Sequence, residues 1–104
     1  MTPSKSQRKI LLEKFELASD EMQKARDLIE KYGEKIYRLV DYEQIALEMK
    51  VHKKGKNNHF QINGRIIFPG GRVASKEQNI NPFVSISEVM EKMATEIEHK
   101  IRRR

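Results

Sequence analysis

Three histidines, His52, His59 and His99, are the side chains best suited to acid–base or metal chemistry in this sequence. His52 and His59 fall on adjacent expected strands, where together they supply at most two nitrogen ligands. No cluster of carboxylates accompanies them, whereas a zinc site uses three or four protein ligands. The sequence has no cysteine, no Ser-His-Asp elbow, no His-Glu-x-x-His and no P-loop. We therefore expect a protein that is not an enzyme and holds no metal or other cofactor.

A glycine pair followed by cations is the second candidate for chemistry. Pro69-Gly70-Gly71 precedes Arg72 and Lys76, and successive glycine amides can curl around an anion. The spacing matches no phosphate-loop fingerprint. An ordinary strand-ending turn is the favoured interpretation, with contact to a nucleic-acid phosphate as the alternative.

Positive charge is concentrated in the middle third of the chain. Residues 42–76 carry seven Lys or Arg and two Glu, which gives +5 of the net +6. Basic side chains on a twisted β-ribbon can follow a phosphate backbone, and each neutralised phosphate adds salt-dependent affinity. Lysine-rich turns also serve as solvated surface or as guards of strand edges. The residues expected to contact nucleic acid or another partner are Lys50, His52, Lys53, Lys54, Lys56, Arg65, Arg72, Lys76, Arg102 and Arg103.

The first element expected to position these residues is a long helix over residues 4–40. Apolar residues recur from Leu11 to Leu39 at alternating spacings of four and three, the period of a coiled-coil seam. Gly33 predicts a stop or bend. Such a helix is too long for the remaining chain to cover, so its N-terminal half predicts an interface with a second copy or another partner. The residues assigned to that interface are Leu11, Phe15, Ala18, Met22 and Ala25.

Residues 44–68 predict three antiparallel strands. Apolar and polar residues alternate from Ile45 to Val51, which is the two-residue period of a half-buried strand. Asn63-Gly64 lies between two runs that contain apolar residues, and Asn-Gly is the strongest short-range hairpin signal. We therefore expect a tight turn at this dipeptide and a polar loop after Phe68.

A second helix is expected over residues 85–103. Ser85 and Glu88 have the spacing of a capping box, and an apolar stripe from Ile86 to Ile101 follows. The predicted fold class is α+β, with a long N-terminal helix, a three-stranded antiparallel β-meander and a C-terminal amphipathic helix. The length of 104 residues predicts a single domain over 1–104.

This expected order of elements resembles that of double-stranded-RNA-binding domains. Their signatures are a Gly-Pro-x-His turn and a lysine cluster that opens the last helix. Here the first turn reads Gly55-Lys56-Asn57-Asn58-His59, and the last helix opens with Ser85, Ser87 and Glu88. The resemblance is one of topology, and we assign no family from it.

Two functional hypotheses follow. The first is a small basic accessory protein of the cytoplasm that binds nucleic acid through a cationic β-ribbon and dimerises through its first helix. The second is a protein-binding module or inhibitor, such as a phage or mobile-element protein that blocks a larger nucleic-acid enzyme, through the helix seam or the basic sheet. No membrane partner is expected, because no apolar run approaches the ~18 residues that span a bilayer.

Overall fold

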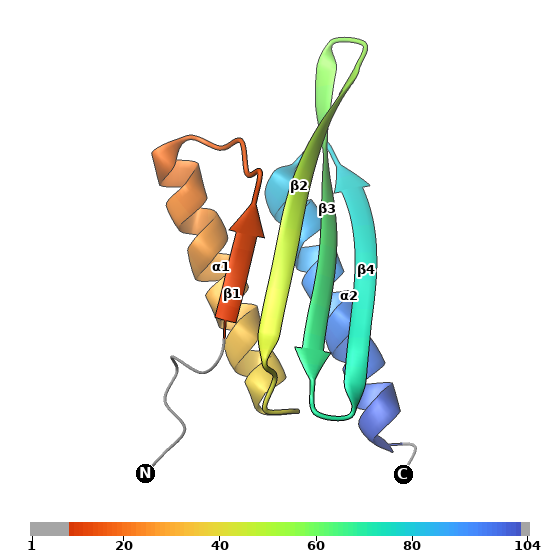
Figure 1. Cartoon of the computed structure of the whole chain (residues 1–104). Helices are drawn as coiled ribbons and strands as arrows, with labels where there is room; N and C mark the ends of the chain where they lie inside the picture. The colour runs from red at the N-terminus through yellow and green to blue at the C-terminus, as the bar shows by residue number, and fades with distance from the viewer. Residues whose placement is uncertain (1–8, 103–104) are drawn as a thin grey trace.

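The computed structural model describes residues 9–102, which form a sheet backed by two helices (Figure 1). The elements in chain order are β1 (Lys9–Glu13), α1 (Ser19–Tyr37), β2 (Gln44–Lys54), β3 (Asn57–Phe68), β4 (Gly71–Asn79) and α2 (Pro82–Arg102). The strands lie side by side in the order β1-β2-β3-β4; β1 is parallel to β2, and the other pairs are antiparallel. Both helices pack on one face of the sheet and leave the other face open (Figure 1).

The expected three-stranded meander with a long N-terminal helix is therefore wrong. The sheet has four strands and is mixed, and the segment 9–13 is a strand rather than a helix. Ile10 and Leu12 of β1 pack against the core, whereas Leu11 points the other way. Lys14 then adopts a positive φ of 59°, a conformation that no α-helix contains. The chain reaches helical geometry only at Ser19, and residues 4–8 of the expected helix lie outside the described residues.

Helix α1 continues through Gly33 instead of ending there. Gly33 is buried, and a Cβ at this position would lie 3.3 Å from the Tyr42 hydroxyl and 3.7 Å from Ile10 Cδ1. The glycine thus allows the helix to lie close to β1 and to the segment that enters β2. A glycine at position 33 therefore reflects close packing and does not mark the end of a helix.

The Asn63-Gly64 dipeptide is likewise not a turn. Strand β3 runs through it, and the hairpin turns lie at Gly55 and at Pro69-Gly70. A Cβ at Gly64 would lie 2.6 Å from Val89 Cγ1 and 2.8 Å from Met93 Cε. Glycine inside a strand is typical of such a close approach, and here it lets α2 pack on the middle of the sheet.

The segment expected as a polar loop is strand β4, and the second helix begins earlier than Ser85. The Asn81 Oδ1 accepts a hydrogen bond of 2.9 Å from the backbone N–H of Phe83, so Asn81 caps α2. Ser85 is fully buried, and its hydroxyl donates to the Phe60 carbonyl at 2.7 Å. Ser85 therefore ties the first turn of α2 to β3.

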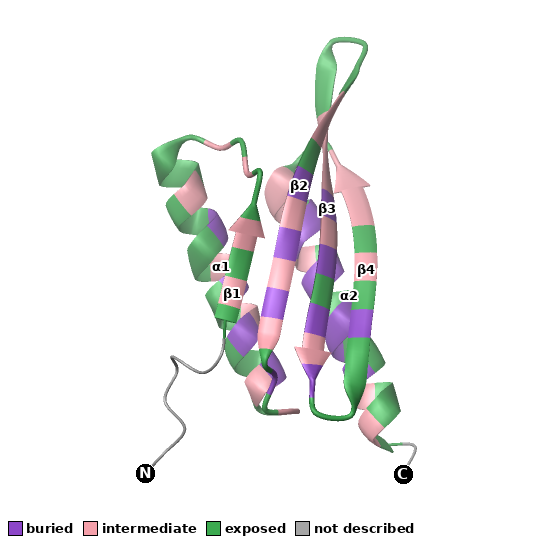
Figure 2. Ribbon diagram, viewed as in Figure 1, coloured by how far each residue is buried: buried purple, intermediate pink, exposed green. Residues whose placement is uncertain are grey.

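The core lies between the sheet and the two helices (Figure 2). Its fully buried side chains include Ile29, Ile36, Ile45, Leu47, Met49, Ile62, Ile66, Val89, Met90, Met93 and Ile97. In the part of the chain from 9 to 102, neither helix is apolar enough over a sufficient length to cross a bilayer.

Candidate nucleic-acid interface

The open face of the sheet carries basic side chains from all four strands. Successive residues of a strand point to opposite faces, so the buried positions of β2 and β3 fix which residues point outward. Strand pairing extends this assignment to β1 and β4. The Lys and Arg residues of this open face are Lys9, Lys50, Lys54, Arg65, Arg72 and Lys76, and its acidic residues are Glu13 and Glu48.

Charge is divided between the two layers of the fold. Residues 44–79, which form β2, β3, β4 and their turns, contain seven Lys or Arg and two Glu. Helix α1 has four Lys or Arg against five acidic residues, and α2 has three against four. The sheet layer therefore attracts anions, while the helix layer is slightly acidic.

The β2–β3 hairpin projects beyond the rest of the sheet (Figure 1). The two strands pair as far as Lys54 and Asn57, whereas β4 pairs with β3 only as far as Phe60 and β1 pairs with β2 only as far as Glu48. Among residues 9–102, no other strand therefore lies beside residues 52–59, the hairpin tip. The tip contains three lysines and no acidic residue; they are Lys53, Lys54 and Lys56.

His52 and His59 are direct cross-strand partners at the base of the hairpin tip. The His52 Nε2 lies 2.9 Å from the Gln61 Oε1, and the Gln61 Nε2 donates to the Asn63 Oδ1 at 2.8 Å. A row of polar contacts thus runs along the open face from the tip toward the middle of the sheet. Within residues 9–102, no group of three or more His, Asp or Glu gathers as metal ligands would.

The remaining expected contact residues do not form one patch. Arg65, Arg72 and Lys76 lie on the open face, whereas Arg102 lies at the C-terminal end of α2, away from the hairpin tip (Figure 1). Arg103 lies outside the described residues. The sequence interpretation missed Lys9 and Glu13 as residues of the same face, because their alignment depends on the parallel pairing of β1 with β2.

The five residues expected to form a helix interface do not share a helix face. Leu11 lies on the open face of β1 and is 41% exposed. Phe15 lies in the connection to α1, and Ala18 precedes the helix. Met22 and Ala25 belong to α1, where Ala25 is fully buried in the core. The coiled-coil seam, and the dimer inferred from it, therefore lose their structural basis.

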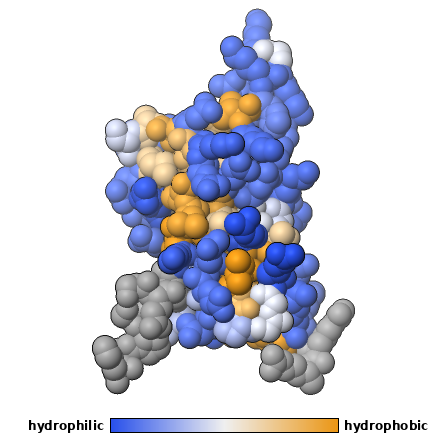
Figure 3. All heavy atoms as spheres, viewed as in Figure 1, coloured by the Kyte–Doolittle hydropathy of each residue, from blue (hydrophilic) through white to orange (hydrophobic). Residues whose placement is uncertain are grey.

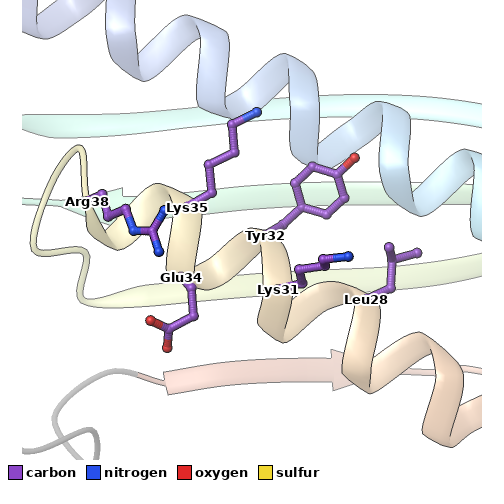
Figure 4. Close-up of a pocket in the computed structure, with 6 residues that line it drawn as sticks. All are labelled: Leu28, Lys31, Tyr32, Glu34, Lys35 and Arg38. Carbon is purple, nitrogen blue, oxygen red and sulfur yellow. The ribbon is translucent and has the colours of Figure 1, made fainter.

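A hollow of about 650 Å³ on α1 is lined by charges of both signs. Figure 4 shows Tyr32 and Lys35 extending toward α2, while Glu34 points away from it. The Lys35 Nζ lies 3.3 Å from the Glu91 Oε2 on α2 and 6.0 Å from the centre of the Tyr32 ring. This lysine therefore joins the two helices beside the hollow.

No family model matches the sequence, and no curated protein matches it. The fold is similar to that of a ribosomal subunit interface protein from Coxiella burnetii, with a TM-score of 0.65 and 13% identity over 88% of this chain and 94% of that one. It is also similar to the N-terminal domain of Protein Y from Thermus thermophilus, with a TM-score of 0.60 and 20% identity over 88% and 93% of the two chains. At these identities the likeness establishes the fold.

Proposed function

We propose that this protein is a non-enzymatic accessory protein that binds the ribosome, with the open face and the hairpin tip against ribosomal RNA. The observation that carries the proposal is the division of charge, with seven Lys or Arg against two Glu in residues 44–79. The choice of the ribosome is supported by the similar fold of a protein described as a ribosomal subunit interface protein.

The shape of the sheet layer supports contact with an RNA surface. The open face presents cations from every strand, so several phosphates can be neutralised at once. The hairpin tip adds three residues per strand beyond the β4 pairing, a reach of about 10 Å at ~3.3 Å per residue. Duplex RNA offers a wide, shallow minor groove bordered by phosphates, which a projecting two-stranded ribbon can follow.

Co-sedimentation with purified ribosomal subunits tests the proposal. The wild-type chain is expected to pellet with ribosomal particles at low salt and to be released as the salt concentration rises, since counterion release dominates such binding. The triple variant Lys53→Glu, Lys54→Glu, Lys56→Glu is expected to lose most of this binding.

A charge-matched control lies on the helix layer. Lys24→Glu, Arg26→Glu, Lys31→Glu changes three exposed cations of α1 by the same amount and is expected to bind nearly as well as wild type. Equal loss in both variants would mean that net charge alone matters. Wild-type protein that stays in the supernatant at every salt concentration would reject the ribosome as partner.

The alternative inhibitor hypothesis relied in part on the apolar helix seam. That seam is divided between β1, a connection and the buried face of α1. No observation on residues 9–102 favours an inhibitor over a ribosome-binding protein.

A further inference from the structure

A shallow hollow of about 240 Å³ lies in the middle of the open face. Its floor includes the two small residues that flank Arg65, which are Ala46 on β2 and Ala74 on β4. Its walls carry four polar side chains from three strands. These are Glu13, Glu48, Asn63 and Arg65.

The polar groups of the hollow retain unused hydrogen-bonding capacity. Among residues 9–102, neither Arg65 nor Glu13 has an ion-pair partner within 4.0 Å, although both line the same hollow. The Asn63 Oδ1 accepts from Gln61, which directs the Asn63 amide N–H groups to another acceptor. Glu48 is held by Lys14 at 3.4 Å. The hollow therefore offers donors from Arg65 and Asn63 beside one available carboxylate.

The carboxylates of Glu13 and Glu48 repel each other across the sheet and would also repel a phosphate ligand. Glu13 and Glu48 are neighbours on the parallel strands β1 and β2, and like charges so placed repel each other. A phosphate would be repelled as well. A carboxylate accepts hydrogen bonds and donates none when ionised, so Glu13 suits a ligand with adjacent N–H groups.

We propose that this hollow binds one unpaired guanine of the RNA, an inference that rests on the proposed ribosome binding. The Watson–Crick edge of guanine presents N1–H and N2–H side by side, and these two donors match the two oxygens of Glu13. Its O6 and N7 are acceptors, which an arginine can bind together. Adenine, cytosine and uracil each have a single donor group on this edge with an acceptor beside it. That acceptor would face a carboxylate oxygen and be repelled.

The surrounding cations complete the site. Lys76 lies at the end of the row that contains Glu13, Glu48 and Asn63, and Lys9, Lys50 and Arg72 lie on the rows that flank the hollow. These cations would hold the phosphates on either side of the base. Unpaired RNA bases are read along their hydrogen-bonding edges in this manner. The hollow supplies base preference, and the rim supplies salt-dependent affinity.

Fluorescence anisotropy with short labelled oligouridines tests the site. One central residue is guanine, inosine, adenine or uracil, at a fixed salt concentration. We expect the guanine oligomer to bind about fivefold or more tightly than the adenine and uracil oligomers, within the range of one two-point base contact. Inosine keeps N1–H but lacks the N2 amine, so its affinity should be intermediate. Equal affinities for guanine and adenine would overturn the inference.

Variants assign the preference to Glu13. In Glu13→Gln and Glu13→Ala the preference for guanine should disappear, while affinity for the all-uridine oligomer stays equal or rises because a negative charge is lost. Glu30→Gln, on the exposed surface of α1, removes the same charge and should keep the preference. A preference that survives both Glu13 variants would overturn the assignment.

Two further measurements separate the ligands and the two proposals. Guanosine monophosphate should compete only at concentrations well above those of the guanine oligomer, and equal competition would make the ligand a free nucleotide, contrary to the inference. Wild-type protein that pellets with ribosomes but shows no base preference overturns the guanine site alone. Protein that fails to pellet overturns the proposed function.

Discussion

Gly64 lies directly beneath Val89: a Cβ at position 64 would come within 2.6 Å of the Val89 Cγ1. Helix α2 thus packs against the sheet at a residue without a side chain. A side chain at position 64 would therefore require the helix or its neighbouring side chains to shift.

Gly64→Ala is expected to destabilise the protein by about 1–3 kcal/mol, the usual effect of an extra methyl group in a packed core. The added Cβ also meets Leu47 and Met93 at 2.8 Å, so no single side chain can move away to accommodate it. Urea unfolding followed by circular dichroism measures the change. Gly33→Ala is the matched control, because its nearest contact is 3.3 Å, and it should cost less. The reverse order would contradict the packing described above.

Ser85→Ala is expected to lower the free energy of unfolding by about 1–3 kcal/mol, because the Phe60 carbonyl then loses its buried donor. Phe60 lies where β3 leaves the sheet to enter the hairpin tip, so amide hydrogen exchange should also accelerate in the tip. Ser87→Ala alters a half-buried serine of the same helix and serves as control. Unchanged stability in Ser85→Ala would show that the 2.7 Å contact has no net effect.

The hairpin tip should account for part of the salt dependence of RNA binding. Changing Lys53, Lys54 and Lys56 to Gln removes up to three phosphate contacts, which should reduce the slope of log K against log salt by about 2–3. Affinity measured at four or more salt concentrations gives this slope. An unchanged slope with weaker binding would mean that these lysines act without touching phosphate.

The ion pair between Lys92 and Glu77 should lose its contribution to stability at high pH. Its hydrogen bond to Glu77 and the charge of that residue raise the Lys92 pKa above 10.5. A raised pKa in the folded state means that the stabilisation is complete below the unfolded value and is lost as pH rises through the folded value. Subtracting the stability of Lys92→Met from that of wild type, from pH 8 upward, should give a difference that shrinks above pH 10.5. A difference that stays constant would contradict this linkage.

Local patterns predicted some elements correctly. The alternation from Ile45 onward is strand β2, which begins at Gln44 as expected. The apolar stripe from Ile86 to Ile101 lies on α2. The excess of positive charge in residues 42–76 was visible in the sequence, although not its separation into one layer of the fold.

The errors arose where a distant partner decides the local structure. Lys9–Glu13 is too short to show the two-residue period of a strand. Its partner β2 follows only after α1 in the sequence. Asn63-Gly64 predicts a turn from the sequence, because the contact of Gly64 with Val89 has no local sequence signal. In β4 only Val73 is buried, so this segment lacks the alternation of apolar and polar residues that marks a strand. The proposed guanine site could not be predicted either, because Glu13 and Arg65 share one face only through the pairing of β1 with β2 and of β2 with β3.

The short parallel pairing of β1 has a consequence for aggregation. Five residues, Lys9–Glu13, cover the edge of β2 from Gln44 to Glu48. If β1 detaches, this edge exposes unpaired N–H and C=O groups, which are a template for strands of other molecules. Association through that edge would also separate Glu13 from the rest of the open face. The same five residues therefore complete the proposed binding surface and cover the Gln44–Glu48 edge of β2.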